Sequence, residues 1–99
     1  MRELCLDGRG WTTSDDVYDA FFAAVGAPPW HGRNFNALND SIATGRINEI
    51  EVPYRVVITN CYLIAGEAKE MTRDFADLLR ELQARGCPVE VELRDLEAH

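Results

Sequence analysis

The chain has no apolar run long enough to cross a bilayer, and its N-terminus does not show the charged-then-apolar pattern of a signal peptide. The longest apolar run, residues 20–25, falls inside an amphipathic pattern. We therefore expect a cytoplasmic protein with no membrane partner. Because 99 residues suffice for one modest core, we expect a single domain over residues 1–99.

Basic residues are scarce. Lysine and arginine number 10 against 17 aspartates and glutamates, which gives a formal net charge of −7. A nucleic-acid binder needs a basic footprint, so we expect no nucleic-acid partner. An excess of acidic groups suits a basic protein partner, because complementary fields speed association, although many acidic proteins owe their charge to solubility alone.

Cysteine and histidine are also few, with three and two residues, and none of them has the spacing of metal ligands. We expect no metal and no cofactor, since a glycine-rich phosphate loop is missing as well. Cys5, Cys61 and Cys87 are predicted to be free, mostly buried thiols. A nucleophilic pair of Cys61 with His31 is the one enzymatic alternative left open, and we otherwise expect no enzyme.

The most informative stretch is 30–42, which reads as a tight turn feeding a short helix. Gly32 permits a bend, and Asn34 is a good N-cap because its side-chain oxygen can accept from an orphan amide. The apolar side chains that follow recur at i, i+3 and i+7, which is one helix face. These residues are Phe35, Leu38 and Ile42.

The opposite face of this helix is predicted to carry short polar side chains, together with one alanine: Asn36, Asn39, Asp40 and Ala43. Thr44-Gly45 supplies a plausible helix end, and Trp30 precedes the helix in the turn. Any surface helix has a polar face. Short side chains beside a large aromatic nevertheless favour a recognition surface, because they lose little rotamer entropy when immobilised.

The remaining elements follow from periodicity, caps and turn residues. The pattern predicts strands at 2–6, 54–59 and 88–93, helices at 14–25 and 68–85, a short helical turn within 61–68, an irregular connection at 46–53 and a loose tail at 95–99. With helices between the strands, the sheet should be mainly parallel in a small α/β domain. The β-branched run 54–59 is predicted to be central and covered on both faces, and 88–93 to lie near an edge.

At this point the sequence resembles a known family. Residues 29–40 match the pattern Gly-x-Asn-hydrophobic-x-Ala-Leu-x-Asp with its preceding aromatics, and 79–87 provide a second match. On these residues the chain is similar to the barstar family of intracellular inhibitors of small secreted ribonucleases. The resemblance implies a small three-layer α/β fold, with helices packed on a mainly parallel three-stranded sheet and a cis Val52–Pro53 bond.

The resemblance also implies a function, in which the second helix and its preceding loop enter the active site of a basic extracellular ribonuclease, one-to-one. Asp40 would be the central carboxylate. The partner-binding residues carried over by position are Trp30, His31, Asn34, Asn36, Asn39, Asp40, Ala43, Thr44, Gly45 and Glu81. Asn36 stands where the best-known member has aspartate, and Asn39 where it has tryptophan. Two alternatives stay open: a binding module of this fold, or an immunity protein for a toxin that is not a ribonuclease.

Overall fold

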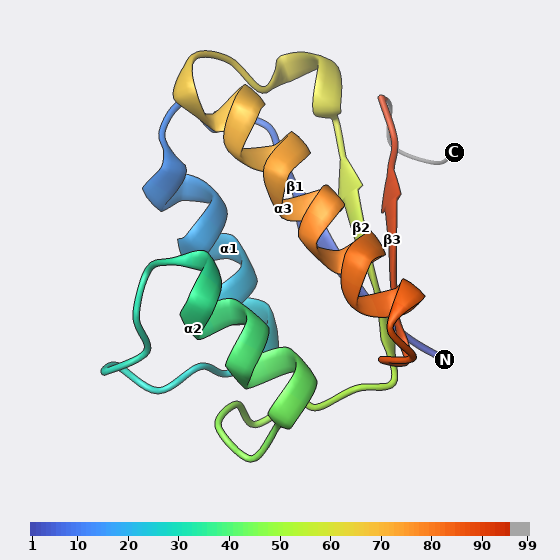
Figure 1. Cartoon of the computed structure of the whole chain (residues 1–99). Helices are drawn as coiled ribbons and strands as arrows, with labels where there is room; N and C mark the ends of the chain where they lie inside the picture. Colours follow the sequence, from blue (N-terminus) through green and yellow to red (C-terminus); the bar gives the residue numbers. More distant parts are fainter. Residues whose placement is uncertain (96–99) are drawn as a thin grey trace.

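The computed structural model describes residues 1–95 (Figure 1). Its elements are β1 (Arg2–Asp7), α1 (Ser14–Val25), α2 (Phe35–Asn39), the π-helical turn η1 (Asp40–Thr44), β2 (Tyr54–Thr59), the 3₁₀ turn η2 (Cys61–Leu63), α3 (Glu67–Ala84) and β3 (Val89–Leu93). Every predicted strand and helix is present, with ends that differ by one residue at most for the strands and the two long helices. The predicted tail, apart from Asp95, lies outside the described residues.

The sheet is parallel throughout and has the order β1-β2-β3. Its register places Leu4 beside Val56, and Val56 beside Val91. Each connection between strands contains helical segments, which is what parallel neighbours require. The prediction of a parallel α/β sheet with 54–59 at its centre and 88–93 at an edge is therefore confirmed.

Caps, glycines and a proline lie at the ends of several elements. Thr13 caps α1 and forms a capping box with Asp16, and Gly26 ends that helix in the left-handed conformation at φ 67°. Gly86, at φ 98°, follows the end of α3. The Val52–Pro53 bond before β2 is cis, as the family resemblance implies.

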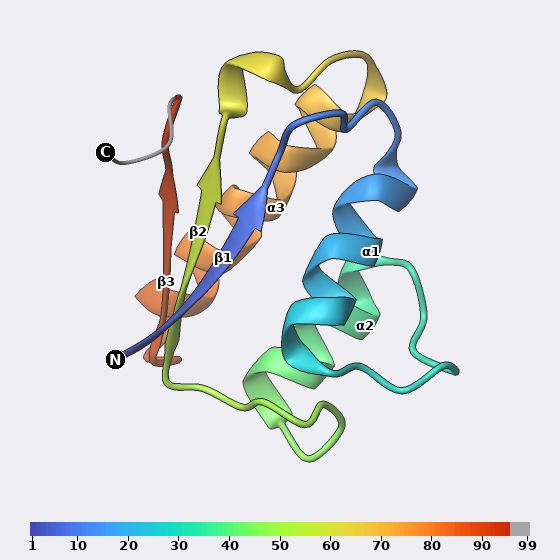
Figure 2. The same cartoon turned by 180° about the vertical axis from the view of Figure 1, so that it is seen from behind.

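The core lies between one face of the sheet and the helices (Figures 1 and 2). Leu4, Val56 and Ile58 supply the sheet side. From the helices, the rings of Phe21 in α1 and Phe75 in α3 meet edge to face, with centroids 5.1 Å apart. This aromatic contact joins the two long helices over the sheet.

The prediction that the central strand is covered on both faces needs correction. Within residues 1–95 no helix covers the second face of the sheet. Figure 2 views the sheet from that side, with the strands in front of α3. Ion pairs occupy that face instead: Arg55 contacts Glu3 at 3.1 Å and Glu90 at 2.8 Å. Val57 is nevertheless fully buried between its strand neighbours, which is why the apolar run resembled a doubly covered strand.

The prediction of mostly buried thiols is also wrong. All three cysteines are free, but Cys5 is exposed on the uncovered sheet face and the other two are half-buried. The physical reason is the side-chain alternation of β1, which turns Leu4 and Leu6 into the core and therefore turns Cys5 away from it. Partial burial raises the pKa of the Cys61 and Cys87 thiols, which disfavours their thiolate forms.

Replacing Phe75 by alanine should lower the free energy of unfolding by about 3–5 kcal/mol, because it removes the ring that packs on Phe21 and leaves a cavity. Urea unfolding followed by circular dichroism measures this loss. Tyr62→Ala, at an exposed position, is the matched control and should change stability by less than about 0.5 kcal/mol. Equal losses in both variants would contradict the assigned core.

Acidification should show how much Asp16 contributes to the stability of the fold. Its carboxylate accepts from the backbone amides of Thr12 at 2.8 Å and Thr13 at 3.0 Å, and these bonds lower its pKa. A carboxylate whose pKa is lower in the folded state stabilises the fold above about pH 4, and this stabilisation is lost as the pH falls below that value. We expect Asp16→Asn to be less stable at neutral pH and to lose less stability on acidification than the parent protein. Asp74→Asn, a substitution at an exposed position of α3, is the control, and identical acid profiles for Asp16→Asn and the parent would contradict this account.

Candidate protein-binding site

The segment α2–η1 docks by its apolar side and is fixed at both ends. The side-chain oxygen of Asn34 accepts from the Ala37 amide at 2.8 Å, which confirms the predicted N-cap. Leu38 and Ile42 are fully buried. Gly45 ends the segment at φ 80°, and its amide donates to the Asp40 carbonyl, which closes a π-helical turn. The sequence predicted one continuous helix, and the π turn was not foreseen.

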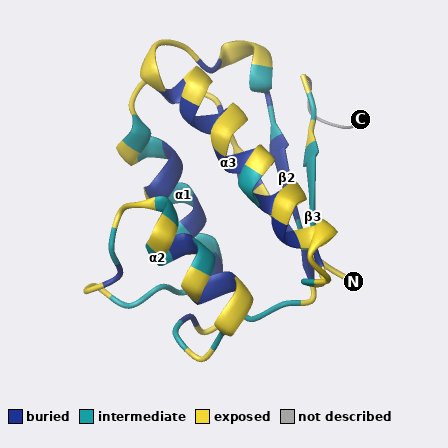
Figure 3. Ribbon diagram, in the orientation of Figure 1, coloured by how far each residue is buried: buried dark blue, intermediate teal, exposed yellow. Residues whose placement is uncertain are grey.

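The outward side of α2–η1 is the predicted polar face. Asn36, Asp40, Ala43 and Thr44 are exposed, and Asn39 is half-buried. Figure 3 shows exposed and buried stretches alternating along this segment. Within residues 1–95, the side chains of Asn36, Asn39 and Asp40 form no hydrogen bond or ion pair. Their polar groups are therefore available to another molecule.

Trp30 and His31, the two aromatics of the preceding loop, have opposite environments. Trp30 is 73% exposed, whereas His31 is only 7% exposed. The ring of His31 lies against Phe22 in α1, with centroids 4.5 Å apart. Sequence reasoning placed both aromatics at a binding surface, and the structure presents only Trp30 to solvent.

His31 links the loop to η1. Its Nδ1 lies 2.8 Å from the Gly32 carbonyl oxygen, so Nδ1–H donates there. Its Nε2 lies 2.9 Å from the Ser41 hydroxyl oxygen, and that hydroxyl also lies within hydrogen-bond distance, 3.3 Å, of the Leu38 carbonyl oxygen. Ser41 is fully buried and was missed by sequence analysis, because a serine in a polar run gives no sign that it faces a histidine ten positions earlier.

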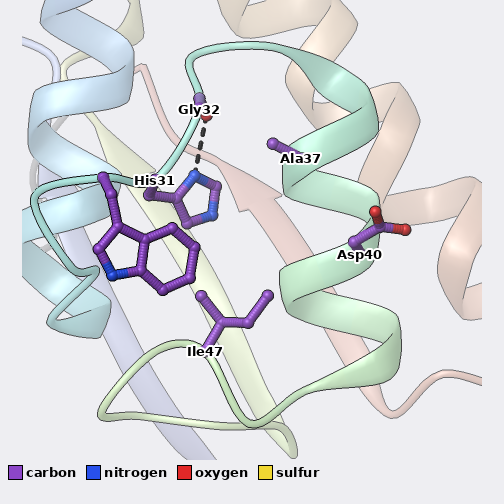
Figure 4. Close-up of a pocket in the computed structure, with 6 residues that line it drawn as sticks. His31, Gly32, Ala37, Asp40 and Ile47 are labelled. Atoms are coloured by element: carbon purple, nitrogen blue, oxygen red, sulfur yellow. Dashed lines mark hydrogen bonds between the residues drawn. The ribbon is translucent and has the colours of Figure 1, made fainter.

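Loop and helix enclose a hollow of about 160 Å³ (Figure 4). It is lined by Trp30, His31, Gly32, Ala37, Asp40 and Ile47. A Cβ on Gly32 would lie 3.0 Å from the side-chain Nδ2 of Asn34 and 3.3 Å from Ala37 Cβ, so a larger residue would press on both side chains. Gly32 does not have a positive φ. Ile47 belongs to a connection without periodicity, which is why its place in the hollow was not predicted.

Glu81 lies on the exposed side of α3, where its carboxylate pairs with Arg85 at 2.8 Å. Arg85 in turn lines a second hollow, of about 370 Å³, between η1 and the end of α3. Asn39 and Ala43 form the other wall of that hollow. The structure thus brings the end of α3 beside the polar face, with the Glu81 carboxylate already engaged.

Arg33, at the turn before α2, is directed away from Asp40. Its guanidinium pairs with Asp15 at 3.2 Å and with Asp19, both on α1, and lies 5.5 Å from the centroid of the Phe22 ring. These contacts fix the loop on α1, and they leave the Asp40 carboxylate without a cation of its own among residues 1–95.

The sequence was also compared with known protein families. A sequence profile described as Barstar (barnase inhibitor) matches residues 1–94. The chain belongs to the barstar family. A search of curated proteins returned no match. Barstar-family proteins are inhibitors and not enzymes, and the match includes every residue of the polar face described above.

The enzymatic alternative is not supported in this barstar-family chain. Both ring nitrogens of His31 are used by Gly32 and Ser41, and the Cys61 thiol donates to the Ile58 carbonyl at 3.3 Å.

No group of side chains among residues 1–95 has the composition of a metal site. Nor does the described part of the chain include a helix long and apolar enough to span a membrane.

Replacing Ser41 by alanine should reduce the free energy of unfolding by about 1–3 kcal/mol, because it leaves the buried Nε2 of His31 without a partner. Chemical denaturation measures the change. Thr44→Ala removes an exposed hydroxyl from the same turn and should have an effect below about 0.5 kcal/mol. If the two variants unfold alike, the His31–Ser41 bond does not secure this segment.

Proposed function

We propose that this protein is an intracellular inhibitor that binds a small, basic, secreted ribonuclease of the barnase type one-to-one and occludes its active site. The observation that carries the proposal is the exposed face of α2–η1. There the Asp40 carboxylate has no partner within residues 1–95 and stands among short amides beside the exposed Trp30. The family match supports an inhibitor of this class.

Asp40 would occupy the place of a substrate phosphate among the arginine, lysine and histidine groups of the enzyme. Carboxylates accept short, charge-assisted and often bidentate hydrogen bonds from such groups. Asn36 and Asn39 would add neutral hydrogen bonds on either side, and Trp30 would cover one flank. Ala43, Thr44 and Gly45 would form the far edge of the contact.

Other members of the carried-over set would support the surface rather than dominate it. His31 uses both ring nitrogens, and Asn34 its side-chain oxygen, within the protein, so we assign them to positioning the loop and the helix start. Glu81 would join the contact only if the nuclease competes with Arg85 for its carboxylate. An inhibitor interface of ordinary size buries roughly 800 Å² on each partner, which α2–η1, the loop and the end of α3 together could supply.

The net charge of −7 would draw a basic nuclease toward this face, and added salt would screen that attraction. We assign the protein to the cytoplasm as a single domain over residues 1–99, acting without nucleic acid, cofactor or membrane. In this position it would protect its own cell from the nuclease before secretion.

One observation favours a second candidate function. Asn36 and Asn39 replace a charged residue and a large anchor of the best-known family member, and Asn39 borders an open hollow that contains Arg85. Such a surface suits a partner with fewer cations and a protruding side chain. The second candidate is therefore an immunity protein, or a binding module of the same fold, whose partner is a toxin other than a ribonuclease.

Titrating the activity of a barnase-like ribonuclease with this protein tests the proposal. We expect activity to fall linearly to zero at one equivalent, and the inhibition constant to rise between low and physiological salt. Full activity at a large excess of inhibitor would reject ribonuclease inhibition for that enzyme. Pull-downs from the native cell would then test the second candidate.

Asp40→Ala should weaken binding more than any other single truncation on this face, by about 2–5 kcal/mol. This is the general range for removing one member of a desolvated charge pair, and measurements on complexes of this family are among those that define it. Glu81→Ala should cost less, because Arg85 already holds that carboxylate at the surface. The affinity of each variant is measured by competition for the nuclease.

Asp74→Ala, an exposed acid of α3 outside the proposed contact, is the charge-matched control and should bind like the parent. Parental affinity in Asp40→Ala would refute the assignment of Asp40 as the central carboxylate.

A further inference from the structure

A second unusual surface lies at the end of the molecule that carries η2 and the C-terminal end of β3, away from η1 (Figure 1). Of the five large hydrophobic residues that are exposed within residues 1–95, three lie there: Tyr62 at 59%, Leu63 at 40% and Leu93 at 38% exposed. Scattered apolar side chains need no explanation, but a cluster on a small protein indicates a contact site.

The cluster borders a hollow of about 340 Å³. Its lining combines residues of η2, the first half of α3 and the end of β3: Cys61, Tyr62, Ile64, Lys69, Arg73, Leu93 and Asp95. Ile64 is buried and forms an apolar part of the wall, whereas Tyr62, Lys69 and Arg73 are exposed around it. The hollow therefore offers both an apolar wall and a charged rim.

The two cations of this rim are unengaged. Within residues 1–95, the side chains of Lys69 and Arg73 make no ion pair or hydrogen bond, even though Asp95 lines the same hollow. Six of the other eight arginines each pair with at least one carboxylate within residues 1–95: Arg9, Arg33, Arg55, Arg80, Arg85 and Arg94. Lys69 and Arg73 stand one helical turn apart on α3, where like charges repel each other.

We propose that this hollow is a second protein-binding surface, which takes an acidic segment of a partner that also carries an apolar side chain. The partner's carboxylates would meet Lys69 and Arg73, and its apolar side chain would lie against Tyr62, Ile64 and Leu93. Charge complementarity carries the choice of occupant, since an anion relieves the repulsion between the two cations.

An aromatic ring beside two cations also resembles a platform for single-stranded RNA. The net charge of −7 opposes an RNA, whose phosphates would meet an acidic protein on every side of a two-cation site. A peptide needs only one or two carboxylates at the rim. Because this surface lies apart from α2–η1, the second partner could bind while a nuclease is held.

The test is an NMR titration of the ¹⁵N-labelled full chain with a short blocked peptide that repeats Asp-Glu-Leu. We expect saturable shifts of backbone amides within 61–73 and 93–95, and none with the neutral peptide that repeats Asn-Gln-Leu. The double variant Lys69→Glu, Arg73→Glu should weaken binding at least about tenfold. Arg2→Glu, Arg80→Glu makes the same change in net charge elsewhere and should stay within about twofold of the parent.

Tyr62→Ala separates the apolar contribution from the charge contribution, and should still weaken binding at high salt, where the charge contribution is screened. The Lys69→Glu, Arg73→Glu variant should inhibit a barnase-like ribonuclease as the parent does, so failure of this proposal is distinguishable from failure of the inhibitor function.

Several results would overturn the proposal. Equal losses in the two double variants would show attraction by net charge alone. Tighter binding of an oligouridylate than of the acidic peptide would assign the hollow to RNA. Concentration-dependent self-association that Lys69→Glu, Arg73→Glu abolishes would assign it to a second copy of the chain. If a variant that ends at Asp95 bound the acidic peptide about tenfold more tightly, the hollow would be assigned to residues 96–99, which the structure does not describe.

Discussion

The buried hydrogen bond between His31 and Ser41 is the contact on which the presentation of the candidate surface depends. It joins the loop before α2 to the turn after it, so Trp30 and Asp40 border one hollow. The histidine ring also packs on Phe22, which ties the pair to α1 and through α1 to the core. A surface fixed in this way loses little entropy on binding, which is a large part of what separates tight from weak complexes of equal size.

The distribution of ion pairs decides which charged groups remain for partners. Arg33, Arg55 and Arg85 are each held by nearby carboxylates, whereas Asp40 at one end and the Lys69–Arg73 pair at the other have no partner among residues 1–95. Exposed ion pairs contribute little stability, so their main consequence here is local neutralisation. Under the two proposals, the surface around Asp40 would take a basic partner, and the smaller surface around Lys69 and Arg73 would take an acidic one.

Sequence patterns predicted the elements well because each is bounded by strong local signals, such as Thr13 and Gly26 around α1, and Asn34 and Gly45 around α2–η1. They predicted the outward residues of α2–η1 from the positions of Leu38 and Ile42. They did not predict that His31 is buried against Ser41, or that Ile47 lines the hollow, because these residues meet only through tertiary contacts that leave no periodic pattern in the sequence. The apolar run of β2 misled for a related reason: Val57 is covered by neighbouring strands and not by a helix.

The most direct test of the account is to map where a barnase-like ribonuclease contacts the ¹⁵N-labelled protein, by cross-saturation from the unlabelled enzyme. We expect losses of amide signal intensity at Trp30, Asn36, Asn39 and Asp40 and through residues 43–45. The amides of 61–64 and 93–95 should keep their intensity. Saturation centred on the η2 end, or on the uncovered face of the sheet, would contradict the claim that α2–η1 is the inhibitory surface.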